Sequence, residues 1–367
     1  MSSTTKLLKI GGKTVRPGQS LDIHLEVSQR YTGDPISLPI RVHRGRRPGP
    51  TVFVSAAVHG DELNGTGVIH ELMFAPEIKL VNGTLILIPV VNVFGFETQN
   101  RYMPDRRDLN RCFPGTPSGN LSSRMAHVIF KQIVGNSDYG IDLHTAAGSR
   151  TNFPNVRGDL SVPEVRRVAK AFGCELMVNG KGPTGSLRRE ATKAGCPTII
   201  LEAGEPCKIE PGILEIGMRG VQNVLKEFGM LPGQCVRPAY QTRVSKSLWV
   251  RSEVGGLLRF HVSPGHPVKE GEPIATNVSV FGKEQCVLVS PVNGIVLSMT
   301  TLPVVKPGEP VCHIAVPNQS LRTVRRALKE VSDTSLGHRL REDLATNISV
   351  TEREEDSVES TETDGDF

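Results

Sequence analysis

The pattern of apolar and polar positions changes twice along the chain. Within residues 1–45, stretches such as LDIHLEV at 21–27 alternate between apolar and polar side chains, which predicts half-buried β-strands. Between about 46 and 235, short continuous apolar runs alternate with stretches of helical periodicity. After about 236 the helical periodicity gives way to short β segments. The pattern therefore predicts an N-terminal β segment, an α/β domain and a small all-β domain.

Four apolar runs in the middle region predict buried strands. They cover residues 51–58, 83–91, 139–143 and 198–201. Helical periodicity lies between and after them, at 63–74, 121–135, 162–173 and 211–228. Continuous apolar strands that alternate with helices are typical of a mostly parallel sheet with helices on both faces. We therefore expect an α/β fold over residues 46–235.

The C-terminal third is expected to contain two different structures. Turn signals such as Pro264-Gly265 and Asn293-Gly294 recur within residues 240–317, which predicts a small β barrel or sandwich. A basic helical stretch begins at residue 318, and the last segment, 352–367, holds eight acids and one base. That segment cannot bury enough apolar surface to offset the entropy of ordering it. Residues 318–367 are therefore expected to form a helical linker and a disordered acidic tail.

Composition narrows the functions that the chain can have. The 367 residues carry a net charge of +5, which becomes +12 without the acidic tail. A basic body suits a small anionic substrate, and the low aromatic content of 5% argues against nucleic-acid binding by stacking. No apolar run is long enough to cross a membrane and no signal-like stretch follows Met1, so a cytoplasmic location is expected. Seven scattered cysteines without a CxxC pair argue against a disulfide framework and a thiolate zinc site.

Polar side chains gather where three of the predicted strands end, which is where open α/β sheets bind ligands. The first strand runs into His59 and Glu62, the third reaches Asp142 and His144, and the fourth reaches Glu202. Two imidazoles and a carboxylate form a ligand set of catalytic zinc, so His59, Glu62 and His144 predict one zinc ion per chain. Asp142 shares a strand face with His144 and could hydrogen-bond to a ligand imidazole. The alternative, helix caps and surface contacts, is less able to explain the recurrence at three strand ends.

The loop after the second strand is rich in arginine. Four arginines lie within residues 101–111, and a proline interrupts the segment. The planar guanidinium group binds carboxylates with two parallel hydrogen bonds. The loop therefore predicts an anion-binding segment, with a solvated basic loop as the alternative.

Four motifs of the chain, taken in order, resemble the succinylglutamate desuccinylase/aspartoacylase family, a branch of the zinc carboxypeptidase superfamily. They are His59-Gly60-Asp61-Glu62, Asp108-Leu109-Asn110-Arg111, Asp142-Leu143-His144 and Leu201-Glu202-Ala203-Gly204. The resemblance spans roughly residues 45–230 and implies a zinc hydrolase with a carboxypeptidase-like α/β fold. It implies that His59, Glu62 and His144 are the zinc ligands and that Glu202 is the general base.

The resemblance also implies roles for residues of the arginine-rich loop. Asn110 and Arg111 match the pair that grips the substrate carboxylate. The arginine that polarises the substrate carbonyl matches Arg101, with Arg107 as a rival because this loop is two residues longer than in aspartoacylase. Arg188 lies near the position of a further substrate-binding arginine. The resemblance further implies a homo-oligomer.

The C-terminal β region resembles the biotinyl/lipoyl carrier barrel. The segments that carry this resemblance are GHPVKEGEPI at 265–274, SPVNGIV at 290–296 and VKPGEPV at 305–311. Lys283 lies about where a carrier lysine would be, but its neighbours Gly282 and Glu284 do not match the acceptor patterns. We therefore expect an unmodified barrel that packs beside the active site.

The residues and the resemblance together predict a zinc-dependent hydrolase that cleaves the amide bond of an N-acyl amino acid or a related carboxylated amide. Zinc would make a water molecule acidic near neutral pH, Glu202 would transfer its proton to the leaving amine, and an arginine would stabilise the oxyanion. Three alternatives remain open. They are a carboxypeptidase acting on peptides, a non-catalytic carrier or binding protein that uses the β barrel, and a metal-free pseudoenzyme.

Overall fold

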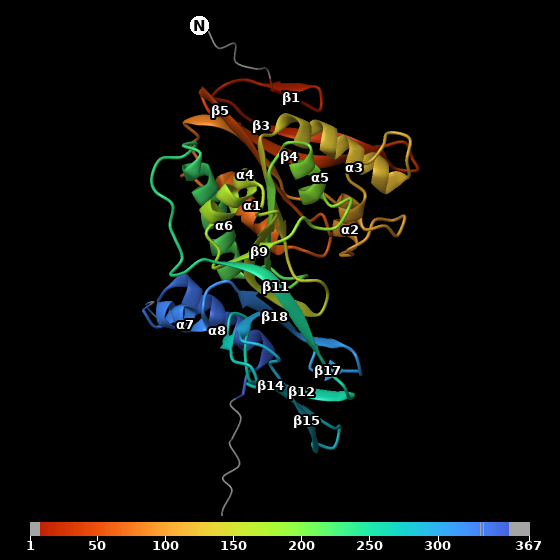
Figure 1. Cartoon of the computed structure of the whole chain (residues 1–367). Helices are drawn as coiled ribbons and strands as arrows, with labels where there is room; N and C mark the ends of the chain where they lie inside the picture. The colour runs from red at the N-terminus through yellow and green to blue at the C-terminus, as the bar shows by residue number, and fades with distance from the viewer. Residues whose placement is uncertain (1–7, 331, 333, 352–367) are drawn as a thin grey trace, which may run out of the picture.

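A computed structural model describes residues 8–330, 332 and 334–351 of the chain. In this part of the chain, twelve strands form one large sheet in the order β13-β16-β18-β11-β9-β8-β10-β7-β5-β6-β4-β3. These strands are β3 (Ser20–Gln29), β4 (Pro35–Arg44), β5 (Arg47–Ala56), β6 (Asn82–Ile88), β7 (Tyr139–His144), β8 (Arg150–Gly158), β9 (Leu176–Asn179), β10 (Thr198–Gly204), β11 (Thr242–Arg251), β13 (Pro267–Val268), β16 (Gly294–Thr300) and β18 (Pro310–Pro317). Figure 1 shows most of the helices grouped around the upper half of the molecule, with the C-terminal strands and the last two helices below them.

The N-terminal segment adds a hairpin to the edge of this sheet. β3 pairs antiparallel with β4, and β4 pairs antiparallel with β6. Ile23, Leu25 and Val27 of β3 are buried while the positions between them are exposed, which confirms the predicted half-buried strand. A short ribbon of β1 (Leu8–Ile10) and β2 (Lys13–Val15) precedes the hairpin.

The middle of the sheet is the predicted α/β unit. β6, β5, β7 and β10 are parallel neighbours, so their carboxyl ends lie at one edge. Alternate residues of β5 enter different cores, because Val52 and Val54 pack on one face and Phe53 packs on the other. The helices of the first face are α1 (Asn64–Phe74), α4 (Pro163–Phe172) and α6 (Pro211–Glu227), and those of the second face include α3 (Leu121–Gln132) and α5 (Leu187–Lys193) (Figure 1). The prediction of helices on both faces is confirmed.

The apolar pattern did not predict β8 and β9, and β8 brings an antiparallel pairing into the middle of the sheet. β8 pairs antiparallel with β10 and parallel with β9. The strand has the sequence RTNFPNVRG, in which Thr151, Asn152 and Asn155 break the apolar run. These polar side chains are buried. The apolar pattern did not predict β8 because several of its buried side chains are polar.

In place of a free-standing barrel, the C-terminal region forms two packed sheets, one of which continues the large sheet. β11 pairs parallel with β9, and β18, β16 and β13 follow it in antiparallel order. The second sheet contains β12 (Gly256–Phe260), β14 (Pro273–Val278), β15 (Glu284–Val289) and β17 (Val304–Val305), all antiparallel. Side chains such as Ile274 and Val311 fill the space between the two sheets. Lys283 is exposed in the turn between β14 and β15, and its relation to a carrier lysine stays a prediction.

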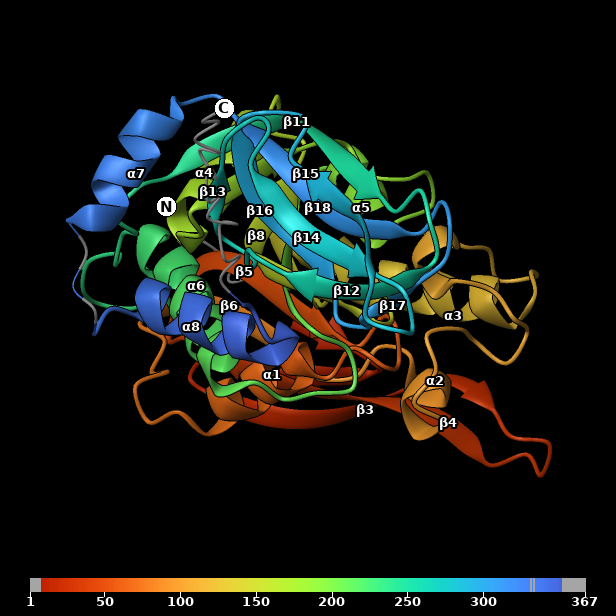
Figure 2. The ribbon, with the colours of Figure 1, turned by 90° about the horizontal axis from the view of Figure 1, so that it is seen from below.

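Two helices follow the C-terminal strands. The predicted basic helix is α7 (Leu321–Lys329), which Ser320 caps by accepting a hydrogen bond from the backbone N–H of Thr323. A further helix, α8 (Leu336–Ile348), lies along α6 (Figure 2) and inserts Leu336 and Leu340 into the main core. The acidic segment 352–367, which was expected to be disordered, lies outside the described residues. No helix within the described ranges is long and apolar enough to cross a membrane.

Candidate active site and metal centre

Two segments at the carboxyl edge of the parallel strands supply the predicted metal ligands. His59 and Glu62 lie in the turn between β5 and α1, and His144 is the last residue of β7. The turn needs glycine at position 60, because a Cβ there would lie 1.9 Å from the carbonyl carbon of Gly95. The backbone at this point is therefore fixed against the short helix α2 (Val93–Glu97), which follows β6.

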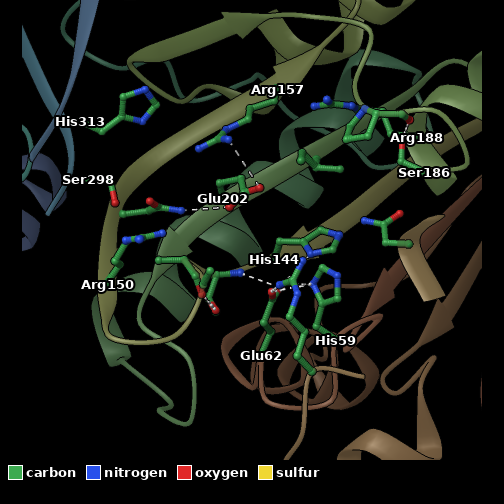
Figure 3. Close-up of a pocket in the computed structure, with 18 of the residues that line it drawn as sticks. His59, Glu62, His144, Arg150, Arg157, Ser186, Arg188, Glu202, Ser298 and His313 are labelled. Atoms are coloured by element: carbon green, nitrogen blue, oxygen red, sulfur yellow. Dashed lines mark hydrogen bonds and ion pairs between the residues drawn. The ribbon is translucent and has the colours of Figure 1, made fainter. Parts of the chain in front are cut away.

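The three side chains meet in a buried cluster with Glu62 in the middle. Glu62 Oε1 lies 2.7 Å from His59 Nδ1, and its Oε2 lies 2.8 Å from His144 Nδ1. One ligand atom from each residue lies within 4.8 Å of the other two. Figure 3 shows both imidazoles directed toward the Glu62 carboxylate. The structure thus brings His59, Glu62 and His144 together as the sequence predicted.

The outer nitrogen of each imidazole faces another carboxylate. His144 Nε2 lies 2.8 Å from Asp142 Oδ2, and His59 Nε2 lies 3.1 Å from Asp108 Oδ1. A carboxylate at Nε2 favours the proton on that nitrogen and leaves the lone pair of Nδ1 directed inward. Two imidazole nitrogens and a carboxylate oxygen are donors that zinc takes, so these residues fit a metal ion. Asp108 was not predicted for this place, although it opens the Asp-Leu-Asn-Arg motif.

The cluster is strongly coupled electrostatically. Burial opposes the charge of Glu62, but His59 and His144 outweigh it and hold the pKa of Glu62 well below its usual range. Burial likewise opposes the charge of His144, but Asp142 and Glu62 outweigh it and hold the pKa of His144 well above its usual range. Without a metal, the imidazole of His144 therefore holds a second proton. A metal ion must displace this proton in order to bind.

Arg101 and Arg107 were the two candidates for polarising the substrate carbonyl. Of the two, only Arg101 lies at the cluster. Its Nη1 lies 3.2 Å from Glu62 Oε1, and its Nη2 donates to Asp108 Oδ2 over 3.2 Å. Arg107 is exposed and does not line the cavity beside the cluster. A substrate-binding role of Arg107 stays a prediction that this cavity does not support.

Asn110, Arg111 and Arg188 line one side of the cavity. The side-chain carbonyl of Asn110 accepts a hydrogen bond of 2.9 Å from the backbone N–H of Leu187, which joins the arginine-rich loop to the start of α5. Arg111 is half-exposed, with its guanidinium 3.8 Å from Asp108. Arg188 is only 8% exposed, and its Nη1 is a buried donor without a partner in the part of the chain that the structure describes. Burial, with a contribution from Arg157, lowers the pKa of Arg188 to about 10.

Glu202 lies on the neighbouring strand, directly beside His144 in the parallel register of β10 and β7. Asn152 donates a hydrogen bond of 2.9 Å to Glu202 Oε2, and Arg157 Nη1 lies 3.9 Å from Glu202 Oε1. The carboxylate lines the same cavity as the three predicted ligands.

Several residues of the cavity were not predicted. The cavity has a volume of about 330 Å³, and its lining also includes Trp249. Figure 3 shows four further residues of this lining, which are Arg150, Arg157, Ser298 and His313. These side chains come from β8 and from the C-terminal strands β11, β16 and β18. Sequence reasoning missed them because it treated the C-terminal strands as a separate unit. The one available signal was the pair of arginines that frames the polar segment at 150–157.

Comparison with known proteins identifies the catalytic region. Residues 48–228 match the family model described as the succinylglutamate desuccinylase/aspartoacylase catalytic domain. With the buried His-Glu-His cluster at the sheet edge, this match defines the protein as a hydrolase of carbon–nitrogen amide bonds. More particularly, its catalytic region belongs to the succinylglutamate desuccinylase/aspartoacylase family.

Individual relatives extend the similarity beyond the catalytic region. The chain is 29% identical over 252 residues to N-alpha-acetyl-L-2,4-diaminobutyric acid deacetylase from Halomonas elongata. This alignment covers 65% of the chain and 73% of the relative. A succinylglutamate desuccinylase/aspartoacylase structure from Rhodobacter sphaeroides is 27% identical, with a TM-score of 0.72 over 83% of this chain and 97% of that one. The product-bound ectoine utilization protein EutE (DoeB) from Ruegeria pomeroyi shares the fold, at 24% identity and a TM-score of 0.72 over 82% of this chain and 96% of that chain.

Proposed function

We propose that the protein is a zinc-dependent deacylase that hydrolyses the amide bond of N-acyl amino acids. The observation that carries this proposal is the position of the buried cluster of His59, Glu62 and His144 in one wall of a cavity lined by arginines. Such a cavity combines a place for a metal ion with groups that bind carboxylates. The similarity to a deacetylase of an N-acetylated amino acid supports the same chemistry.

Glu202 would act as the general base of the hydrolysis. When bound, zinc supplies the Lewis acidity that makes water a nucleophile near neutral pH. Glu202, held by Asn152, would accept the proton of the attacking water and deliver it to the nitrogen of the leaving amino acid. The bond that forms joins the water oxygen to the acyl carbon, and the bond that breaks is the amide C–N bond. The products are a carboxylic acid and a free amino acid.

The arginine-rich loop would bind the parts of the substrate that carry negative charge. Arg101, which contacts Glu62 and Asp108, would stabilise the developing oxyanion. Asn110 and Arg111 would hold the α-carboxylate, and Arg188 adds a buried positive charge beside them. Holding the carboxylate fixes the scissile bond relative to the cluster, which is an entropic contribution to catalysis.

A small substrate suits this cavity better than a peptide. Its volume of about 330 Å³ is at the lower end of the range for small-molecule sites. Trp249 and His313 of the C-terminal strands form part of its wall. We therefore favour the deacylase over the carboxypeptidase.

The proposal is tested by incubating the full chain, with one equivalent of zinc, with N-acetyl, N-formyl and N-succinyl amino acids and measuring the released amine. We expect release from at least one acyl series and no release after chelation of the metal. A dipeptide series serves as the comparison for carboxypeptidase activity. Hydrolysis of dipeptides alone, or no hydrolysis by a protein that holds its zinc, would overturn the proposal.

A further inference from the structure

A second cavity, separate from the active site, lies where α8 packs against the rest of the protein. Its volume is about 120 Å³, and none of its lining residues belongs to the active-site cavity. Figure 2 shows α8 beside α6, which also borders this space. Five segments supply its aromatic and charged lining, which consists of Phe153 of β8, Glu175 before β9, Arg219 of α6, Arg237 before β11 and Arg341 of α8. We call this space the α8 cavity.

The wall of the α8 cavity carries more positive than negative charge. The ionisable residues of its lining are three arginines and one glutamate. Arg341 is paired with Glu175, because its Nη2 donates to Glu175 Oε2 over 2.5 Å and its Nη1 donates to Oε1 over 3.3 Å. Arg219 and Arg237 make no ion pair with any residue that the structure describes. Two positive charges of the wall are therefore left without a carboxylate.

The pair of Glu175 and Arg341 is held in place by further contacts. Arg341 Nη1 donates a hydrogen bond of 2.9 Å to the carbonyl of Gly337, one turn earlier in α8. The guanidinium of Arg341 also lies 4.8 Å from the centre of the Phe153 ring, at a distance typical of a cation–π contact. A Cβ at residue 337 would lie only 3.1 Å from Glu175 Oε1, so the glycine lets α8 approach the carboxylate closely. Glu175 is thus committed to Arg341 and is not placed to neutralise the other arginines.

Arg219 and Arg237 border the cavity from different elements. Arg219 is half-buried on α6 and has no hydrogen bond to any described residue. Arg237 is exposed, and its Nη1 donates a hydrogen bond of 2.7 Å to the backbone carbonyl of Lys170 in α4. Two guanidinium groups at one cavity repel each other unless an anion lies between them. Their planar N–H groups suit the oxygen atoms of such an anion.

The size of the α8 cavity limits the anion that it can hold. A volume of about 120 Å³ is room for roughly four water molecules at about 30 Å³ each. A phosphate, sulfate or acetate ion is of this size, whereas a nucleotide or an N-acyl amino acid is larger. The cavity therefore suits a small oxyanion.

We propose that the α8 cavity binds a small oxyanion, held by Arg219 and Arg237, and that this anion fastens α8 to the catalytic domain. Leu336 and Leu340 of α8 border the same cavity, so an anion bound there would restrain the helix. The inference concerns a place outside the active site and does not depend on which amide the protein hydrolyses. Two sources share the required chemistry: inorganic phosphate, and a short carboxylate such as the acid that amide hydrolysis releases.

Calorimetric titration of the zinc-loaded full chain with phosphate, sulfate, acetate and chloride tests the site. We expect one oxyanion to bind at the α8 cavity and chloride not to replace it. Tighter binding of phosphate and sulfate than of acetate identifies a tetrahedral anion as the ligand, and the reverse order identifies a carboxylate. Arg219→Met and Arg237→Met should each weaken binding about 10- to 100-fold, because a charge-assisted hydrogen bond is lost. Arg219→Lys keeps the charge and should weaken it less.

One further variant separates the α8 cavity from the arginines of the active site. Arg188→Met removes a buried arginine of the active-site cavity and should leave binding at the α8 cavity unchanged. The bound oxyanion should also slow amide hydrogen exchange in α8. If Arg188→Met abolishes all oxyanion binding while Arg219→Met and Arg237→Met do not weaken it, the anion lies in the active site and the inference is overturned.

Thermal unfolding separates an anion site from a merely structural role of these arginines. Without an oxyanion, Arg219→Met should unfold at or above the midpoint of the unchanged protein, since it removes a charge that no carboxylate balances. Saturating phosphate should raise the midpoint of the unchanged protein by about 2 to 5 °C and that of Arg219→Met much less. Arg322→Met, at an exposed position of α7 outside the cavity, is the matched control and should gain as much as the unchanged protein. Equal gains in the unchanged protein and in Arg219→Met, or no binding of any oxyanion, would overturn the inference.

Discussion

Asn152 donates a hydrogen bond of 2.9 Å to Glu202 across the antiparallel pairing of β8 and β10. One carboxylate oxygen is thereby held in place, and the other lies 3.9 Å from Arg157. The backbone carbonyl of Glu202 also accepts a hydrogen bond of 3.1 Å, from the side chain of Asn155. The position of Glu202 thus depends on β8, a strand that the apolar pattern of the chain does not predict.

This arrangement makes Glu202→Gln an informative variant. The glutamine keeps the size of the side chain and can still contact Asn152, but it cannot accept a proton from water. We expect turnover to fall by a factor of about 100 to 10,000 while zinc content is unchanged. Zinc and turnover should be measured on one preparation. Loss of zinc would make Glu202 a ligand, and full activity would place the base elsewhere.

The metal ligands are expected to respond differently. His59→Ala or His144→Ala removes one of three donors and should abolish stoichiometric zinc binding together with activity. Asp142→Asn leaves the ligands present but weakens the orientation of His144, so zinc affinity should fall about 10- to 100-fold. His24→Ala, at an exposed position of β3, serves as the control and should bind a full equivalent. A full equivalent of zinc in both His59→Ala and His144→Ala would contradict the proposed site.

Zinc binding should also depend on pH in a defined direction. The carboxylates of Asp142 and Glu62 hold the pKa of His144 above its usual range, so the metal-free protein carries a proton that zinc must displace. Affinity should therefore weaken as the pH falls, and binding at neutral pH should release protons. Calorimetric titrations in two buffers of different ionisation enthalpy measure this release. Identical heats in both buffers would show that no proton is displaced.

The sequence allowed the cluster to be predicted because its residues stand at the ends of apolar strands. His59, Glu62 and His144 each follow a run that predicts a buried strand, and parallel strands end at one edge. Arg150 and Trp249 gave no such signal, because about 100 residues separate them and the pairing of β11 with β9 is not visible in either segment. Their meeting depends on strand order, which local patterns do not determine. The homo-oligomer that the resemblance implies stays a prediction.

The C-terminal helices yield a test of what the last residues contribute to stability. Leu336, Leu340 and Leu344 of α8 are buried, and Arg341 forms an ion pair with the partly buried Glu175. Ending the chain after residue 335 removes these contacts, and we expect the thermal midpoint to fall by about 10 °C. Ending it after residue 351 removes only the acidic segment and should leave the midpoint and the activity nearly unchanged. A large loss on the shorter deletion would show that the acidic segment packs against the rest of the protein.

The turn that carries two of the ligands should be sensitive to a single methyl group. A Cβ at residue 60 would lie 1.9 Å from the Gly95 carbonyl carbon and 2.3 Å from the Phe96 nitrogen, and neither backbone atom can move independently. The backbone N–H of Gly60 also donates a hydrogen bond of 3.1 Å to the carbonyl of Asn100, beside Arg101. Gly60→Ala should therefore displace the His59–Glu62 turn, weaken zinc binding and lower the thermal midpoint together. Gly12→Ala is a suitable control, because its φ of +78° makes alanine unfavourable there while no atom lies within 4 Å of the new methyl group. A Gly60→Ala protein with normal zinc affinity would show that the turn can adapt, and the rigid placement of His59 and Glu62 would have to be abandoned.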